Sequence, residues 1–481
     1  MLAARSLALT RSQPIRLVAV RQLLTGWGRT PASAATIVRR RSSDRTGLAE
    51  LVRSLPERGA IARGLGRSYG DSAQNGGGLA IRLDDELAPG AIEVDPVAGA
   101  VTAAGGVSLD GVLRVSIPRG LFVPVSPGTR FVTVGGAIAS DIHGKNHHVD
   151  GTFGAHVQAL TLLLADGTTV DIGPGRQPEL FWATVGGMGL TGIIVRATIA
   201  MVPIETGRMT VDTERVGDLD ELLDVMTTGD DAYRYSVAWI DLLARGRAVG
   251  RSVLTRGDHA RVEELAPAQA VHPLAYRPGH VATVPPIVPG RGLLNHSTIA
   301  AFNEVWYRKA PRRRVGEIVS IPRFFHPLDA IGSWNRLYGN GGLVQYQFLV
   351  PFGQEEALRR VVTRFAERGT PSFLSVLKRF GAANPAPLSF PAPGWTLTLD
   401  IPAGVDGLAH LLAELDEVVL AAGGRHYLAK DAVATPEAIR RGYPRLAEWQ
   451  AVRDSVDPHG RWASDQSRRL RLTGWSREAE R

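Results

Sequence analysis

Lysine is rare in this chain, and one lysine near the C-terminus is a candidate for proton transfer. The 55 basic residues include only four lysines, which are Lys145, Lys309, Lys378 and Lys430. Lys430 lies in the short segment Tyr427–Asp431, outside any obvious solvent-exposed helix. A lysine amine acts as a general base when its surroundings lower its pKa. The alternative is a surface lysine paired with Asp431.

A second polar segment, Asp141–His148, combines histidines with Lys145 in the sequence DIHGKNHH. Clustered histidines can bind a metal ion, but Gly144 opposes the helix that would align two of them with an acidic partner. The sequence therefore predicts no metal site. His143 and Lys145 remain candidates for contact with a ligand, and the alternative is a loop whose histidines satisfy backbone groups.

Three glycine-rich segments could hold phosphate groups: Gly64–Gly70, Pro127–Thr129 with Val134–Ala137, and Gly186–Gly192. Successive backbone N–H groups converge on an anion where Cβ atoms are absent. Neither the first nor the third is a dinucleotide-binding loop of the Rossmann kind. The first follows a short strand but opens no helix, and the third follows a helix-like segment and leads into a strand. Any one of them could be a tight turn, but three favour a single extended cofactor.

Two amides and a lysine alternate along segments with the pattern of strands. Gln345 and Gln347 lie two residues apart, so a strand would present both on one face, where they could bind sugar hydroxyls. Lys378 lies in a similar alternating segment, Ser372–Arg379, and could meet a phosphate. An exposed strand face is the alternative for both.

The elements that carry these residues indicate an α+β protein with two domains. The glycine-rich stretch from Gly26 to Glu205 predicts short strands, at Ala60–Ala62, Leu79–Leu83, Ala91–Val94, Ala100–Ala103, Ala159–Leu164, Thr169–Ile172 and Gly192–Met201, with few helices. Beyond it, strands and longer helices predict an antiparallel sheet with helices on one face. We expect residues 25–205 and 425–481 to form one domain and 206–424 the other, after a poorly ordered extension at 1–24. A proline-rich surface loop is expected at Pro267–Gly292.

Composition removes several classes of function. The chain has no cysteine, which excludes disulfides and thiolate catalysis. No window approaches the roughly 20 apolar residues that span a bilayer. The net charge is +8, but its arginines are dispersed except at Arg39–Arg41 and Arg312–Arg314. No nucleic-acid-binding module is present, so contact with an anionic lipid surface is the better interpretation of the charge.

Several motifs carry a resemblance that covers nearly the whole chain after Thr25. The segments Ala62–Asp71, Pro127–Thr129 and Gly135–Ala139 resemble the FAD domain of vanillyl-alcohol-oxidase-type flavoproteins. More narrowly, the chain resembles the flavoprotein subunits of decaprenylphosphoryl-β-D-ribose 2′-epimerases. The motifs that carry this narrower resemblance are WGRT (Trp27–Thr30), GRSYGD (Gly66–Asp71), DIHGKNHH, FWATVGGMGLTGII (Phe181–Ile194), WYRK (Trp306–Lys309), FFHPLD (Phe324–Asp329), QYQF (Gln345–Phe348) and APLSFPAPGW (Ala386–Trp395).

The resemblance implies a role for each candidate residue. It implies catalysis by Lys430, His143 and Tyr69, and substrate binding by Lys145, Gln345, Gln347, Lys378, Thr398 and Phe325. The residues that it implies bind FAD are Arg63, Gly64, Leu65, Gly66, Arg67, Ser68, Tyr69, Pro127, Gly128, Thr129, Thr133, Gly135, Gly136, Ala139, Ile142, His143, Gly192, Ile194, Tyr427 and Lys430. The first glycine loop holds no histidine to which a flavin could be attached, so we expect FAD to be non-covalent.

The implied reaction is oxidation of the ribose 2′-hydroxyl of a polyprenyl-phosphoryl-ribose, which a partner keto-reductase would complete as an epimerisation. We expect a peripheral protein of the cytoplasmic membrane, with Pro267–Gly292 and the segment around Phe324 as lipid-facing elements. Two positions depart from the family: Thr398 replaces a frequent cysteine, and Phe325 a frequent tyrosine. The alternatives are a soluble alditol or aldonolactone oxidase and a non-catalytic flavin- or lipid-binding partner.

Overall fold

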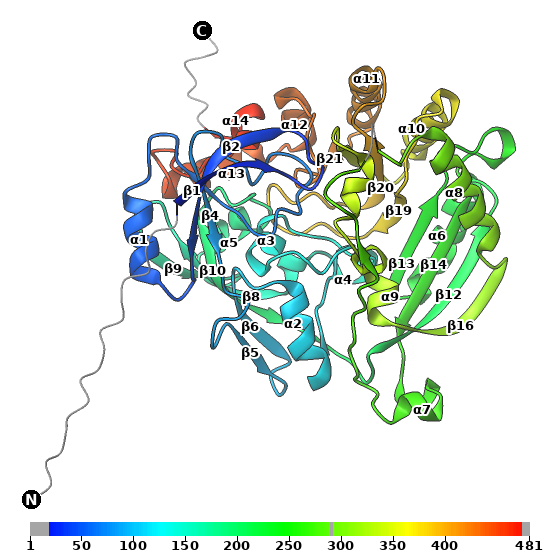
Figure 1. Ribbon diagram of the computed structural model, residues 1–481, viewed down its shortest axis with the longest axis horizontal. Coiled ribbons are helices and arrows are strands. Elements are labelled where there is room, and N and C mark those ends of the chain that lie inside the picture. Colours follow the sequence, from blue (N-terminus) through cyan, green and yellow to red (C-terminus); the bar gives the residue numbers. More distant parts are fainter. Residues whose placement is uncertain (1–18, 289–291, 474–481) are drawn as a thin grey trace, which may run out of the picture.

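Two large antiparallel sheets and one small mixed sheet form the framework of the protein (Figure 1). The computed structural model describes residues 19–288 and 292–473. In Figure 1 the small sheet and a five-stranded sheet lie on the left, and an eight-stranded sheet lies on the right. Short strands with few long helices in one half, and a helix-covered antiparallel sheet in the other, confirm the α+β class.

The small sheet begins earlier in the chain than the sequence predicted. Its strands, in spatial order, are β1 (Ala19–Thr25), β2 (Ala32–Arg40), β4 (Leu79–Leu83) and β3 (Ala60–Ala62). The expected extension at 1–24 is therefore too long, because β1 pairs with β2 along its whole length. Residues 1–18 lie outside the described residues. Helix α1 (Arg45–Arg53) packs Leu48 and Val52 against this sheet, and the Asp44 carboxylate caps it by accepting from Gly47 N at 3.0 Å.

The five-stranded sheet is antiparallel throughout and carries the glycine-rich connections. Its strands, in order, are β5 (Ile92–Asp95), β6 (Ala100–Ala104), β10 (Ile193–Ala200), β8 (Val157–Leu163) and β9 (Thr169–Ile172). Helices α2 (Leu109–Ser116) and α5 (Pro178–Thr184) contribute to its core. The glycine-rich segment Val134–Ala137 is not a tight turn but belongs to helix α3 (Val134–Ala139), whose first turn is capped by Thr133 Oγ1 accepting from Gly136 N at 3.1 Å.

The eight-stranded sheet is also antiparallel, as predicted for the second half of the chain. Its strands, in order, are β16 (Arg313–Ser320), β12 (Arg208–Val216), β14 (Ser252–His259), β13 (Tyr235–Ile240), β19 (Ser375–Phe380), β20 (Gly394–Pro402), β18 (Leu343–Pro351) and β21 (Arg425–His426). One face buries Ala238, Leu377 and Leu397 under helices α6 (Leu219–Gly229), α10 (Glu355–Arg368) and α11 (Leu408–Ala421). The alternating residues of these strands point to the opposite face, which is turned toward the first half of the chain.

The C-terminal segment returns to the first half of the chain. It contains α12 (Pro436–Gly442), α13 (Leu446–Val456) and α14 (Asp465–Arg469). The indole N–H of Trp449 donates to Ala183 O at 2.9 Å, and Trp462 lies in the core beneath α1. Strand β21, however, joins the eight-stranded sheet. The expected boundary at residue 425 therefore separates this strand from the sheet to which it is hydrogen bonded.

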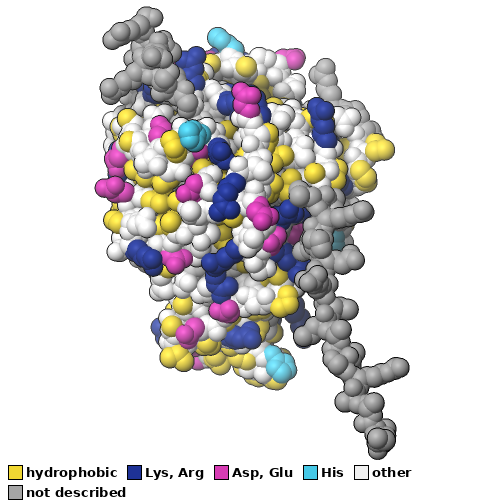
Figure 2. Space-filling model, turned by 90° about the vertical axis from the view of Figure 1, so that its left-hand side faces the viewer, with side chains coloured by type: hydrophobic (Ala, Val, Ile, Leu, Met, Phe, Trp, Pro, Cys, Tyr) yellow, Lys and Arg dark blue, Asp and Glu magenta, His cyan; other side chains and the backbone are white. Residues whose placement is uncertain are grey.

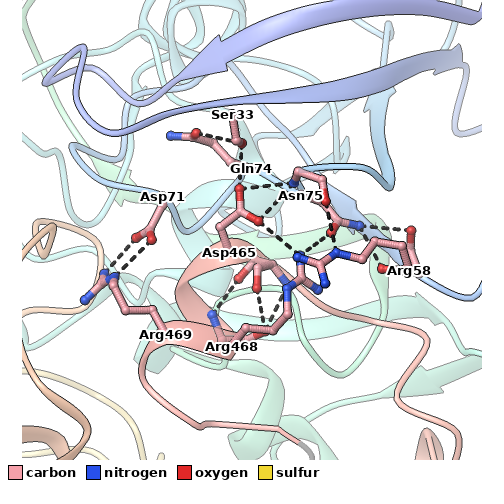
Figure 3. A network of polar contacts seen from close by, with 12 residues as sticks. Ser33, Arg58, Asp71, Gln74, Asn75, Asp465, Arg468 and Arg469 are labelled. Carbon is pink, nitrogen blue, oxygen red and sulfur yellow. Dashed lines mark hydrogen bonds and ion pairs between the residues drawn. The ribbon is translucent and has the colours of Figure 1, made fainter.

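A network of polar side chains holds α14 against the first glycine loop (Figure 3). Asp465 accepts from Ser33 Oγ at 2.6 Å and from Gly76 N at 2.9 Å. Arg469 donates to Asp71 Oδ1 and to Asp431 Oδ2, each at 2.7 Å. Both acids are buried while Arg469 is half-buried, so these ion pairs fasten the segment that carries Lys430 to the end of the first loop.

On the face drawn in Figure 2, charged side chains are dispersed, as they are along the sequence. Figure 2 shows acidic and basic side chains interspersed with apolar ones on the face that carries the small sheet. Within residues 19–288 and 292–473, every helix is too short or too polar to cross a bilayer. The expected loop at Pro267–Gly292 contains helix α7 (Pro267–Ala270) and strand β15 (Ala282–Thr283), which pairs with β17 (Ile331–Gly332).

Candidate active site and cofactor cleft

A cavity of about 830 Å³ lies between the glycine-rich connections and the open face of the eight-stranded sheet. Every residue predicted to bind cofactor or substrate, or to act in catalysis, contributes to its lining. These residues come from segments as distant as Arg63 and Lys430. The structure thus brings all the candidates together, while their individual roles stay predictions.

The first glycine loop offers a row of unused backbone donors. Arg63 N donates to Ile81 O and Tyr69 N to Ala429 O, which fixes the two ends of the loop. Between them, the N–H groups of residues 64–68 have no acceptor in the part of the chain that the structure describes. The Arg63 guanidinium holds the loop from behind by donating to Thr25 O at 2.7 Å and to Ala73 O at 2.8 Å. Such consecutive free donors suit a pyrophosphate.

The second and third glycine segments close the cavity around that loop. A Cβ atom on Gly64 would lie 2.4 Å from Thr133 Oγ1, so only glycine allows the first loop to approach α3 this closely. The N–H groups of Gly128 and Thr129 have no acceptor among the described residues. In the third segment Met188 N donates to Ala139 O, and Gly192 lines the cavity where β10 begins. These contacts fit the elongated cofactor that the sequence predicted.

Lys430 extends from a tight turn into the cavity. Its backbone N–H donates to Tyr427 O at 2.9 Å. Its Nζ lies 4.1 Å from the centre of the Tyr69 ring. Burial lowers the pKa of Lys430 below the ordinary value for lysine, and the nearby Asp400 carboxylate opposes this shift. Asp431 is engaged by Arg469 instead, so the alternative of a surface pair with Lys430 is wrong.

His143 faces the same space as a neutral imidazole. The Gln347 amide donates to its Nε2 at 2.9 Å, which leaves the ring proton on Nδ1. Burial, and next the charge of Lys378, holds the pKa of His143 well below its ordinary value. Its Nδ1 is buried with no partner among the described residues. In contrast, His147 accepts a hydrogen bond from Gly381 N, and His148 contacts Tyr233 O. These two contacts agree with the alternative interpretation, a loop whose histidines satisfy backbone groups.

Three of the four lysines line the cavity, so it carries concentrated positive charge. Burial, and then the charge of Lys378, lowers the pKa of Lys145 to about 7. Burial, and then the charge of Lys430, lowers the pKa of Lys378 to about 7. Lys145 Nζ already donates to Phe324 O at 2.5 Å and lies over the Phe324 ring. A buried group of cations is stabilised by an anionic ligand.

A row of side chains leads away from His143 across the open face of the sheet. Cross-strand pairs connect Gln347 to Thr398, Thr398 to Val376, Val376 to Trp239, and Trp239 to Val253. Side chains that are direct cross-strand partners share one face. Four strand spacings of about 4.8 Å make the row about 19 Å long. All five residues line the cavity, which is thus polar near His143 and mostly apolar farther out.

The outer part of this row was not predicted from the sequence. The alternation within Tyr235–Ile240 would have placed Val237 and Trp239 on the face opposite to the buried Ala238. Asp400, to which the Gln345 amide donates, was not predicted either. Burial raises the pKa of Asp400, while Gln345 and then Lys430 oppose the shift.

Comparison with known proteins agrees with this geometry. A model of the FAD-binding domain matches residues 42–173, and a D-arabinono-1,4-lactone oxidase model matches residues 405–470. The chain is 46% identical over 455 residues to the decaprenylphosphoryl-β-D-ribose oxidase of Mycolicibacterium smegmatis, covering 93% of this chain and 97% of that protein. It belongs to the decaprenylphosphoryl-β-D-ribose oxidase family. It is thus an FAD-dependent oxidoreductase, and the free donors of residues 64–68 fit that cofactor.

More distant relatives have names that refer to other substrates. An alditol oxidase of a Streptomyces species is 26% identical, over 84% of this chain and 89% of that protein. An L-gulono-1,4-lactone dehydrogenase of Mycobacterium tuberculosis is 23% identical, over 88% of this chain and 93% of that protein. The sequence identity to the Mycolicibacterium smegmatis protein is thus considerably greater than the identity to either of these two relatives.

Thr398 and Phe325, the two positions at which this chain departs from the family, have different surroundings. Thr398 is 8% exposed and lies between Val376 and Gln347 in the row described above. Phe325 is 2% exposed and packs against Phe122 and Tyr235, with ring centres 5.0 and 4.9 Å away. Phe324 is also buried. Both side chains line the cavity, and a lipid-facing role for the segment around Phe324 stays a prediction.

Thr398 makes this chain insensitive to inhibitors that bond to a thiol at that position. Its hydroxyl is a far weaker nucleophile than a thiolate, and the chain has no cysteine elsewhere. We expect intact-protein mass spectrometry to detect no adduct after treatment with such an inhibitor and substrate. The matched variant Thr398→Cys should form one adduct per chain, and an adduct on the unsubstituted protein would contradict the prediction.

Proposed function

We propose that this chain oxidises the 2′-hydroxyl of a polyprenyl-phosphoryl-ribose to a ketone, the first half of its epimerisation to the arabinose form used for cell-wall arabinan. The observation that carries the proposal is the sequence of polar, basic and apolar surfaces along one cavity. Amides and His143 suit a sugar, the lysines suit a phosphate, and the apolar row beyond them suits an isoprenoid chain. A partner keto-reductase would complete the epimerisation.

The chain's own residues supply the proton chemistry of this reaction. Lys430, held partly neutral by burial, accepts the hydroxyl proton on Nζ. Gln347 and the Nδ1–H of His143 orient the sugar, and Lys378 neutralises the substrate phosphate. When bound, FAD supplies the acceptor for the hydride that leaves the carbinol carbon. The aromatic side chains around His143 exclude water from the reacting atoms.

An anaerobic visible spectrum tests the proposal directly. The purified protein is loaded with FAD and mixed with a short-chain polyprenyl-phosphoryl-ribose, with free ribose and with an alditol. Bleaching of the oxidised-flavin bands by the first compound alone supports the proposal. Bleaching by the alditol or by free ribose would favour a soluble sugar oxidase. Flavin that stays oxidised with all three would favour a non-catalytic flavin- or lipid-binding protein.

We further propose that the FAD is held without a covalent bond. The loop with free donors, residues 64–68, contains neither histidine nor cysteine, so it offers no side chain for attachment. We expect acid precipitation of the holoprotein to leave essentially all flavin in the supernatant, with the mass of free FAD. Yellow colour remaining in the washed pellet, or a flavin-sized mass increase on the chain, would contradict this.

A lipid-linked substrate would require the protein to work at a membrane surface. We therefore propose a peripheral location at the cytoplasmic membrane. The segment Pro267–Gly292, in which most of the described residues are exposed, remains a candidate lipid-facing element. Fractionation of cells with and without a high-salt wash tests this location, because a protein held by charge should move from the membrane to the soluble fraction.

A further inference from the structure

Helix α8 (His296–Lys309) presents aromatic and aliphatic side chains to solvent. Phe302, Val305 and Trp306 are 36%, 65% and 45% exposed, and the rings of Phe302 and Trp306 stack with centres 5.8 Å apart. A short connection leads to β16, the edge strand of the eight-stranded sheet, where Val315 is 63% exposed. We call this surface, formed by Phe302, Val305, Trp306 and residues 312–315, the α8–β16 rim.

The rim also carries a compact positive charge. Arg312, Arg313 and Arg314 are all exposed and directly precede Val315. Arg314 pairs with Glu317 at 3.1 Å, but Arg312 and Arg313 have no carboxylate partner among the described residues. The guanidinium groups of these two arginines are therefore free to meet anions from outside the protein.

The rim stands at the outer end of the active-site cavity. Phe302 and Trp306 line that cavity while remaining partly exposed to solvent. Val319 on β16 and Val211 on β12 belong to the same lining, next to the strand that carries Val253. The row of side chains that starts near His143 becomes apolar farther out, and its apolar part continues toward this surface.

We propose that the α8–β16 rim is the surface on which the protein docks to an anionic lipid bilayer. Exposed aromatic side chains bury favourably at the boundary of headgroups and acyl chains, and adjacent arginines are attracted to anionic headgroups. Docking there opens the apolar end of the cavity toward the membrane, so an isoprenoid chain reaches it without crossing water. The inference rests on the proposed function, because a lipid-linked substrate gives this orientation its use.

Vesicle co-sedimentation of the full-length FAD-loaded protein tests the electrostatic half of the proposal. Phosphatidylglycerol vesicles should bind the protein, and phosphatidylcholine vesicles should bind it much less. Arg312→Gln with Arg313→Gln should weaken binding to phosphatidylglycerol roughly tenfold to thirtyfold, at about one kcal/mol for each arginine near the surface. The matched pair Arg41→Gln with Arg45→Gln removes the same charge from two exposed arginines at the junction of β2 and α1 that also have no carboxylate partner among the described residues, and it should change binding less than threefold. Equal losses in both double variants, or no binding by the unsubstituted protein, would overturn the proposal.

The apolar half is tested by Val305→Asp, which places a charge where the rim would enter the bilayer. Val97→Asp is its control, because Val97 is 99% exposed on the turn between β5 and β6. Val305→Asp should weaken vesicle binding at least tenfold, while Val97→Asp should leave it unchanged. Equal binding of the two variants would overturn the proposal.

Turnover of a detergent-soluble short-chain polyprenyl-phosphoryl-ribose distinguishes a failure of the docking surface from a failure of the proposed function. Rim variants that lose vesicle binding but keep this turnover support docking through the rim. Turnover by the unsubstituted protein, with vesicle binding unaffected by the rim variants, overturns the docking surface and leaves the proposed function standing. Absence of turnover in the unsubstituted protein overturns the proposed function itself.

Discussion

Replacement of Lys430 by methionine should lower kcat for polyprenyl-phosphoryl-ribose oxidation by about 10²- to 10⁴-fold, the usual contribution of a general base. Methionine keeps much of the apolar stem of lysine but cannot accept a proton. FAD should remain bound, because the free donors of the first loop are untouched. Stopped-flow measurement of flavin bleaching under saturating substrate checks the result.

Lys309→Met is the matched control, because Lys309 is the one lysine outside the cavity and is exposed on α8. It should leave kcat on a soluble short-chain substrate within twofold of the unsubstituted value. If Lys430→Met also stays within that range, Lys430 is not the base.

The pH dependence should have a definite sign. A base must be unprotonated, and burial lowers the pKa of Lys430. The rate constant of flavin bleaching should therefore rise with pH until it passes that pKa, and then level off. Phosphate binding should respond in the opposite direction, because Lys145 and Lys378 lose their charge above about pH 7. In Lys430→Met the rise of the rate constant with pH should disappear, while the weakening of binding at high pH should persist.

Substitution of Gly66 by valine should weaken FAD binding by about tenfold or more. Gly66 has φ of 66°, a left-handed conformation that costs an L-residue roughly 1–2 kcal/mol. Its new Cβ would also approach Arg63 Nη2 to 2.6 Å, and that guanidinium holds the phosphate loop in place. The loop would have to shift, and its N–H groups would no longer converge. Titration of the apoprotein with FAD, followed by flavin fluorescence, measures the change.

Gly99→Val isolates the effect of position from the effect of backbone strain. Gly99 has nearly the same φ, 62°, but a Cβ atom there would meet no atom within 4 Å. Gly66→Val should lose at least as much stability in thermal unfolding as Gly99→Val, because it adds a close contact to the same backbone strain, and only Gly66→Val should lose FAD affinity. Equal FAD affinities in the two variants would show that the loop conformation does not hold the cofactor.

Local patterns predicted most of the elements but not all of them. Short apolar runs between glycine-rich turns located β3, β4 and β9 at the predicted residues, and β8 and β10 to within two residues. Helix α3 was missed because consecutive glycines disfavour a helix, and the cap from Thr133 together with tertiary packing outweighs that preference. Strand β1 was missed because most of its residues are exposed, so no buried face marks it in the sequence. Its existence depends on pairing with β2.

The sequence by itself determined most of the residues that line the site. Glycines clustered in three segments, a lysine in a chain of arginines, and two amides spaced by two residues can be recognised without knowledge of the fold. Motif resemblance then implied a role for each of them. For this reason the cofactor and the candidate catalytic residues were predictable.

Only the tertiary structure decided how those residues act together. The row from Gln347 to Val253 crosses β18, β20, β19, β13 and β14, and the pairing of β19 with β13 joins segments that are far apart in sequence, so the register of the row cannot be inferred from any one segment. The pKa values of Lys145 and Lys378 are lowered first by burial and then by the charges of Lys378 and Lys430 respectively, which act only once the sheet and the glycine loops enclose one cavity. The same closure places the apolar face of α8 at its outer end. Side-chain chemistry is carried by single residues, whereas register, burial and electrostatic coupling depend on segments that meet only when the chain folds.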